Sequence, residues 1–263
     1  MAMVDVKRAG LAGSPSPVIW ADCPIKRFLY NPGDGIHIMD HFIAGRAANV
    51  SPNGTWELVG TNADLNVVED DYPGVVLLAG SGADNDSSFL RSAAVYDLTM
   101  NSGRRFWFEI RAKVPDEDAD TAIIAGLMEP TGCTAEGIAD AGADLIDEDF
   151  IGFLAVTDAT NMGNVQAVYS QGGDAAHTDI VASAHSPADD AYFKLGMKFD
   201  GKKTVACYAD GVAVGTLDVD DLANDSLTNP LAIFFGLKAC AGAAQGMEVD
   251  WVRFACDNYA LGY

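Results

Sequence analysis

The chain has 263 residues, 49% of them hydrophobic, and its 16 basic and 38 acidic residues give a net charge of −22. Proteins that bind nucleic acid contact phosphates through Lys and Arg, so this balance argues against nucleic acid and against an anionic membrane surface as partners. No apolar run approaches the roughly 20 residues that cross a bilayer, and the N-terminus lacks a secretory signal. We therefore expect a protein made and folded in the cytoplasm, with a self-repelling, acidic surface that suits an exterior location.

Residues 1–36 have no sustained period and contain four prolines, which favour extended conformations. We predict an extended N-terminal arm over 1–36 and one domain over 37–263. An apolar arm usually lies against something, either its own domain or a neighbouring subunit. The apolar residues of the arm, which are the candidate partner-binding residues, are Val18, Ile19, Trp20, Phe28, Leu29 and Tyr30.

The rest of the chain predicts about a dozen short strands separated by turn residues, which is typical of a β-sandwich or barrel. No helical period is long enough to compete. Residues 129–148 are expected to form a long loop with a helical turn near 134–141. The expected strands cover 36–42, 56–59, 75–78, 93–96, 104–114, 122–128, 151–156, 165–169, 180–184, 193–199, 204–209, 212–217, 231–237 and 249–254.

The clearest pattern is a meander over 192–217. Its first strand alternates apolar and polar residues, so one face should be buried. Asp-Gly pairs at 200–201 and 210–211 supply the positive φ angles that tight hairpins need. We predict that the apolar residues of this strand share one sandwich interior with those of 104–114; they are Phe193, Leu195, Met197, Phe199, Phe106, Phe108 and Ile110.

The strand, Asp-Gly, strand, Tyr-x-Asp-Gly, strand order of this meander resembles the concanavalin A-like lectin/glucanase superfamily. In particular, the chain resembles concanavalin A-like structural proteins of tailed bacteriophages. The resemblance implies an all-β fold, an antiparallel jelly-roll β-sandwich. It covers roughly residues 37–256, through matching segments at 40–42, 106–111, 149–153, 199–201, 208–211 and 249–253.

Glucanases of this superfamily carry paired carboxylates in a Glu-x-Asp-x-x-Glu pattern, because retaining hydrolysis needs two carboxyl groups about 5 Å apart. The nearest carboxylates in this chain do not reproduce that spacing, and Glu109 is followed at the second position by Arg111 instead of an acid. We therefore assign no catalytic residue. The acidic loop residues that come nearest to the motif are Asp144, Asp147, Glu148 and Asp149.

The lectin pattern of calcium and manganese ligands is also missing, and we expect neither a metal nor another cofactor. Acidic clusters that could supply oxygen ligands to calcium are common by chance in so acidic a protein. The four histidines are scattered, and the five cysteines are odd in number and widely spaced, which favours buried free thiols. The acidic clusters are Asp84 with Asp86, Asp116 with Glu117, Asp118 and Asp120, and Asp218 with Asp220 and Asp221.

The resemblance implies a non-enzymatic structural protein of a phage virion, and we expect a head decoration or cement protein on the capsid exterior. Its partners would be the capsid shell protein and copies of itself, since capsid proteins are presented in symmetric sets. The alternative is a carbohydrate-binding module of a tail fibre or cell-surface protein, with host-surface glycans as ligands. Trp56 or Trp107 would then have to be exposed to stack on a sugar, instead of packing under a loop. A glycanase is a third reading, which the missing carboxylate motif disfavours.

Overall fold

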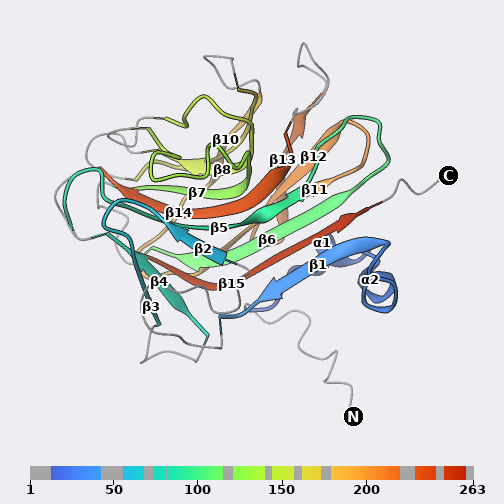
Figure 1. Ribbon diagram of the computed structural model, residues 1–263, viewed down its shortest axis with the longest axis horizontal. Coiled ribbons are helices and arrows are strands. Elements are labelled where there is room, and N and C mark those ends of the chain that lie inside the picture. The colour runs from blue at the N-terminus through green and yellow to red at the C-terminus, as the bar shows by residue number, and fades with distance from the viewer. Residues whose placement is uncertain are drawn as a thin grey trace.

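The computed structural model describes residues 13–42, 56–67, 74–80, 82–114, 121–139, 144–156, 162–172, 179–219, 229–240 and 246–258. These residues form two antiparallel β-sheets packed face to face, with two short helices beside one of them (Figure 1). The prediction of an all-β, jelly-roll sandwich is thereby confirmed. In the part of the chain that is described, no helix is long and apolar enough to span a membrane.

The first sheet has eight strands in the order β13-β12-β11-β6-β15-β4-β3, with β1 paired to β15. The C-terminal strand β15 is the longest and binds three neighbours along its length, which ties both ends of the described chain into one sheet. The strands are β1 (Gly35–Asp40), β3 (Asp64–Val67), β4 (Val76–Ala79), β6 (Phe106–Lys113), β11 (Phe193–Phe199), β12 (Thr204–Ala209), β13 (Val212–Asp218) and β15 (Gly246–Asp257).

The second sheet has seven strands in the order β10-β9-β8-β7-β14-β5-β2. The strands are β2 (Trp56–Val59), β5 (Ser87–Tyr96), β7 (Thr121–Met128), β8 (Phe150–Ala155), β9 (Val165–Ser170), β10 (Asp179–His185) and β14 (Leu231–Ala239). Every predicted strand range overlaps an observed strand. The four-residue strand β3 was not predicted, because its sequence Asp-Leu-Asn-Val is too short and too polar to stand out.

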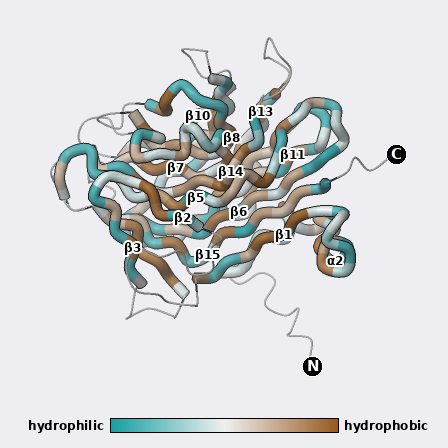
Figure 2. The backbone as a smooth tube through the Cα atoms, viewed as in Figure 1, coloured by the Kyte–Doolittle hydropathy of each residue, from teal (hydrophilic) through white to brown (hydrophobic). Residues whose placement is uncertain are grey.

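The space between the sheets is filled by one large apolar cluster drawn from both layers, and Figure 2 shows hydrophobic segments running along the strands of both sheets. Met197 on β11 lies opposite Phe108 on β6, and Leu195 lies opposite Ile110. All seven residues predicted for the interior are at most 2% exposed and belong to this cluster. The predicted faces of β6 and β11 are therefore confirmed.

Two turns shape the predicted meander. Asp210 and Gly211 have φ angles of 49° and 78°, and they join β12 to β13 as a two-residue hairpin. The other Asp-Gly pair opens a longer loop, in which the Asp200 carboxylate accepts backbone N–H groups from Lys202, Lys203 and Thr204. The three-strand meander is confirmed, although only the second of its turns is of the tightest kind.

The prediction of an extended arm is wrong for residues 17–30, which contain helix α1 (Pro17–Trp20) and helix α2 (Ile25–Tyr30). Pro17 occupies the first turn of α1 and Pro24 immediately precedes α2, and proline is well tolerated there because the first N–H groups of a helix lack partners within the helix. Pro17 and Pro24 thus mark helix starts instead of an extended course.

The described parts of the segment from 129 to 148, namely 129–139 and 144–148, lie on the outer face of the second sheet. Ile138 and Leu145 pair as an isolated bridge and pack with Phe150 and Phe234 in a second apolar cluster. The predicted helical turn near 134–141 is not formed in the described part: Gly137 instead donates to the Thr134 carbonyl in a single turn, while residues 140–143 lie outside the description. This segment is docked on the sheet as part of the fold.

Candidate functional site

The described part of the arm lies along the outer face of the first sheet, with α2 against β1 and α1 against β11 (Figure 1). Ile19, Trp20 and Phe28 pack with Trp107 and Ala255 in a third apolar cluster, and none of the five is more than 7% exposed. Trp107 interrupts an otherwise polar strand face, and the arm supplies the cover that this residue needs. Half of the predicted arm residues therefore contact the chain's own domain.

Glu109 anchors the arm to the sheet. Its fully buried carboxylate accepts the Ser16 backbone N–H at 2.9 and 3.1 Å and the Trp20 indole N–H at 2.7 Å. Hydrogen bonds to a charged group are roughly twice as strong as neutral ones, and a buried carboxylate without them would be very costly. The arm and Glu109 thus depend on each other, and Glu109 is closed off from solvent.

Two aspartates extend this polar contact. Asp22 on the arm accepts hydrogen bonds from Lys198 at 2.6 Å and from the Trp107 indole at 3.1 Å. Burial alone would raise the pKa of Asp22, but these two donors outweigh it and the net pKa is lowered. On the sheet, the fully buried Asp257 side chain receives Arg27 of α2 at 2.8 Å. One ion pair, Asp22 with Lys198, therefore fixes the chain just after α1, and another, Arg27 with Asp257, fixes α2.

Arg253 joins the arm to β1. Its guanidinium lies 4.1 Å from the centre of the Trp20 ring, and its Nε donates to Nε2 of His37 at 3.2 Å. Burial, and then the charge of Arg253, lower the pKa of His37 to about 4. His37 is thus neutral at neutral pH, which is the state that can accept this hydrogen bond.

The other three predicted arm residues are exposed. Val18 is 50% exposed, Leu29 68% and Tyr30 89%. The arm is therefore two-sided: one side is buried in its own sheet, and the other presents apolar side chains to the surroundings on helices that are already fixed. Partner binding through these residues stays a prediction.

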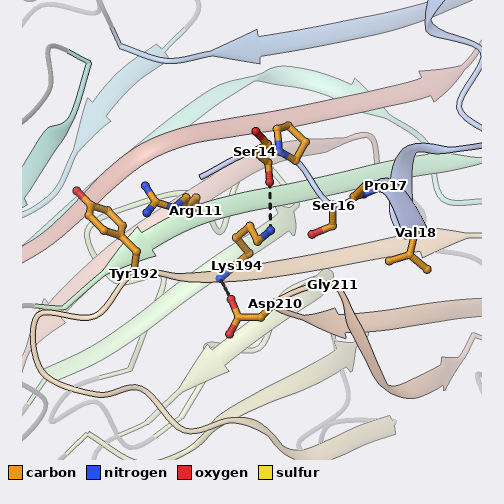
Figure 3. A pocket seen from close by; sticks show the side chains of 10 residues that line it. Ser14, Ser16, Pro17, Val18, Arg111, Tyr192, Lys194, Asp210 and Gly211 are labelled. Carbon is orange, nitrogen blue, oxygen red and sulfur yellow. Dashed lines mark hydrogen bonds between the residues drawn. The ribbon is translucent and has the colours of Figure 1, made fainter. Parts of the chain in front are cut away.

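A pocket of about 560 Å³ lies between the arm and the first sheet. In Figure 3, Arg111 and Tyr192 stand at one end and Val18 at the other, with Lys194 and Asp210 between them. Because its lining comes from four separate segments, no sequence pattern marks it as a unit. We call it the arm pocket, and its lining residues are Ser14, Pro15, Ser16, Pro17, Val18, Arg111, Tyr192, Lys194, Asp210 and Gly211.

Two contacts shape the polar part of the arm pocket. Lys194 Nζ donates to the Ser14 carbonyl oxygen at 3.1 Å, while the Lys194 backbone N–H donates to Asp210 Oδ1 at 2.9 Å. The Arg111 guanidinium stacks 3.9 Å from the centre of the Tyr192 ring. Burial, followed by the charge of nearby Glu248, raises the pKa of Tyr192 to about 12, so its phenol is neutral.

The loop carboxylates that come nearest to the glucanase motif serve other contacts. Asp149 is buried and accepts the Gly172 backbone N–H at 2.9 Å, whereas Asp144 and Asp147 are exposed. Glu148 shares the Thr131 hydroxyl with Glu129, and burial, then the Glu129 charge, raises the pKa of Glu148. Glu129 directly follows β7 and Glu148 lies two residues before β8, so this pair is at the strand ends and not on a sheet face. The outward positions of neighbouring β8 are apolar: Phe150, Gly152 and Leu154.

The described acidic clusters are also structural. Asp86 is 1% exposed and accepts from the Asn62 amide and the Ala83 backbone, and Asp218 pairs with Lys203. Within the described ranges, no three His, Cys, Asp or Glu residues are grouped in a way that could hold a metal ion. The cluster at 116–120 and residues 220 and 221 lie outside the described residues.

The two candidate tryptophans and the cysteines are mostly buried. Trp56 is 2% exposed and Trp107 is fully buried, so neither is available for stacking on a sugar. All five cysteines are free, four of them are buried, and Cys23 is half-buried. Burial is the main cause that raises the pKa of Cys23 and Cys133 to about 12, which keeps these thiols protonated and unreactive.

No family model and no curated protein matches this sequence. Among solved structures, an endo-1,3-beta-glucanase from Streptomyces sioyaensis is similar, with a TM-score of 0.58 and 14% identity over 86% of this chain and 97% of that one. Peanut lectin has a TM-score of 0.57 and 13% identity over 85% and 97%. A glycoside hydrolase family 16 endo-glucanase from Bacteroides ovatus has a TM-score of 0.53 and 15% identity over 82% and 99%.

The chain has the concanavalin A-like fold. At this level of identity the similarity shows the fold alone, and the similar structures include both hydrolases and lectins. The arm contacts are a feature of this chain's own residues. Because the similarity shows the fold alone, the function has to be inferred from contacts such as these.

Proposed function

We propose that this protein is a non-catalytic attachment protein of a tailed-phage virion, a head decoration or cement protein on the capsid exterior that is present in symmetric copies. The observation that carries the attachment role is the two-sided arm. Val18, Leu29 and Tyr30 remain exposed although the helices that hold them are fixed to the sheet. A fixed helix loses little conformational entropy when a partner covers it, so such residues make efficient anchors.

Three further features support this proposal. The described acidic residues near β8 do not form a carboxylate pair on an open sheet face, as hydrolysis by two carboxylates would need. The net charge of −22 suits an exterior surface and not one packed against DNA. The resemblance to phage structural proteins supplies the virion context.

The experiment uses particles that lack this protein and the full chain added back. We expect the double variant Leu29→Ser, Tyr30→Ser to fold normally but to co-sediment with particles at least tenfold more weakly, because two exposed apolar anchors are lost. The matched control is Ile180→Ser, which is 43% exposed on β10, an edge strand of the second sheet, whereas the arm lies on the first. Undiminished binding by the double variant would overturn attachment through the arm, and failure of the wild-type chain to join any particle would overturn the virion role.

The second candidate function is carbohydrate binding, and the arm pocket favours it. A concave site that combines an aromatic ring, charged groups and apolar edges is the usual form of a small-molecule site. A glycan array probed with the full chain tests this function, and an array without any bound glycan would overturn it. This function does not use Trp56 or Trp107, which are buried.

A further inference from the structure

We propose that the arm pocket binds an acidic sugar, a hexuronic acid or a glycan unit that carries an equivalent carboxylate. This inference rests on the second proposed function, carbohydrate binding, and gives it a place and a ligand class. The place is the outer face of the first sheet, beneath the arm (Figure 3).

Lys194 supplies the cation. Its ammonium donates to the neutral Ser14 carbonyl, and no carboxylate of the described residues lies within ion-pair distance of it. Other lysines of this acidic chain do have such partners: Lys198 pairs with an aspartate at 2.6 Å and the buried Lys238 with a glutamate at 2.9 Å. An ammonium has three donors, so Lys194 can still bind a ligand carboxylate by a charge-assisted hydrogen bond.

Ser16 supplies a second polar group. Ser16 precedes α1, but its hydroxyl does not cap the helix, and this buried oxygen has no hydrogen-bond partner. The residue is only 2% exposed, and leaving a buried hydroxyl unpaired costs free energy. A ligand oxygen that enters the pocket beside it would supply the missing partner.

Gly211 lies directly against this hydroxyl. A Cβ atom at this position would lie 3.0 Å from Ser16 Oγ, which is tighter than ordinary contact. The φ angle of 78° also disfavours any side chain at this position. The hairpin turn between β12 and β13 therefore packs closely against the Ser16 hydroxyl, and a side chain at position 211 would displace it.

The remaining lining suits a sugar ring better than a simple anion. Asp210 uses Oδ1 for the Lys194 backbone, which leaves its other carboxylate oxygen to accept ring hydroxyls. Pro15 and Val18 offer apolar surface to the C–H groups of a ring, and Tyr192 is held in place at the far end by its contact with Arg111. The pocket thus offers a cation to a ligand carboxylate, an acceptor to ring hydroxyls, and apolar walls to the ring. These features match an acidic monosaccharide unit.

The test measures binding of four free sugars to the full chain by saturation-transfer NMR and calorimetry: glucuronic acid, galacturonic acid, glucose and galactose. We expect the two acids to bind at least tenfold more tightly than the neutral sugars. Lys194→Gln should remove that preference, and Ser16→Ala should weaken binding of the acids several-fold without disturbing the fold, since its hydroxyl has no partner to lose. The matched control is Lys202→Gln, an exposed lysine on the β11–β12 loop.

The outcomes separate the inference from the function on which it rests. Equal binding of neutral and acidic sugars would overturn the acidic ligand class and leave carbohydrate binding standing. Binding of the acids that neither Lys194→Gln nor Ser16→Ala changes would overturn the site. No binding of any of the four sugars, together with an array without bound glycans, would overturn both.

Discussion

The outer faces of the two sheets are both covered by the chain itself, but by different contacts. Over the first sheet, the arm is held by hydrogen bonds to the buried Glu109 carboxylate and by an ion pair at Asp22. Over the second sheet, Ile138 and Leu145 of the 129–148 segment pack on apolar strand residues such as Phe234. Both covers therefore combine apolar and charged contacts: the arm surrounds a buried carboxylate, Glu109, whereas the 129–148 segment pairs its Glu136 with the buried ammonium of Lys238.

The sequence of each strand reflects what covers its outer face. β7 and β14 are buried at every position, and both are apolar nearly throughout, because each has an apolar neighbour on both faces. β6 alternates more, since its outer face meets the arm through polar groups. Four experiments can break or sharpen this comparison; they follow from the largest expected effect to the smallest.

Phe234→Ala tests the cover of the second sheet, the 129–148 segment. Phe234 is fully buried, lies 4.8 Å from the ring of Phe89, and closely approaches Gly137 of the covering segment. We expect a loss of about 3–5 kcal/mol in the free energy of unfolding, from lost transfer energy and an added cavity. Urea unfolding measures it, with Phe234→Leu as the milder control. A loss below about 1 kcal/mol would mean that the 129–148 segment does not seal this face.

Trp20→Ala tests the cover of the first sheet, the arm. The substitution removes a 7%-exposed indole and one donor to Glu109, so we expect a loss of about 3 kcal/mol and faster proteolysis within the arm. Trp20→Phe separates the two contributions, since it keeps most of the packing and loses only the donor. If the arm resisted protease as well in Trp20→Ala as in the wild type, it would be held by something other than this contact.

Glu109→Gln isolates the charge. Hydrogen bonds to charged groups contribute about 1.5–3 kcal/mol, so replacing the carboxylate should cost about 2 kcal/mol. In a double-mutant cycle with Trp20→Phe the two losses should not add, because both act on one hydrogen bond. Additive losses would show that Glu109 and Trp20 stabilise the fold independently.

His37→Gln tests the pH dependence of the first face. Burial and Arg253 lower the pKa of His37 from 6.5 to about 4, so the unfolded chain binds the proton more readily. Stability should therefore fall as pH decreases from about 6.5 to about 4. Gln keeps an acceptor for Arg253 but does not titrate, so the variant should lose less stability over this window. Parallel melting-temperature profiles for the two proteins would exclude His37 as a contributor.

Residue pattern alone determined most of the sandwich. Strict alternation in β11 and β6 placed Phe193 and Phe108 correctly in the interior, because a strand's side chains must point to opposite faces. The Asp-Gly pair at 210–211 located a tight turn for a similarly local reason, the positive φ angles of its two residues. Such signals need no information from distant parts of the chain.

Tertiary structure decided what lies over the sheets. Nothing near Glu109 in the sequence shows that Ser16 and Trp20 would satisfy it, since they are 93 and 89 residues away. The arm's prolines are compatible with an extended course. Helices as short as α1 and α2 are not stable by themselves, so it is their packing against Trp107 that stabilises them. The arm pocket arises in the same way, from segments that only the folded chain brings together.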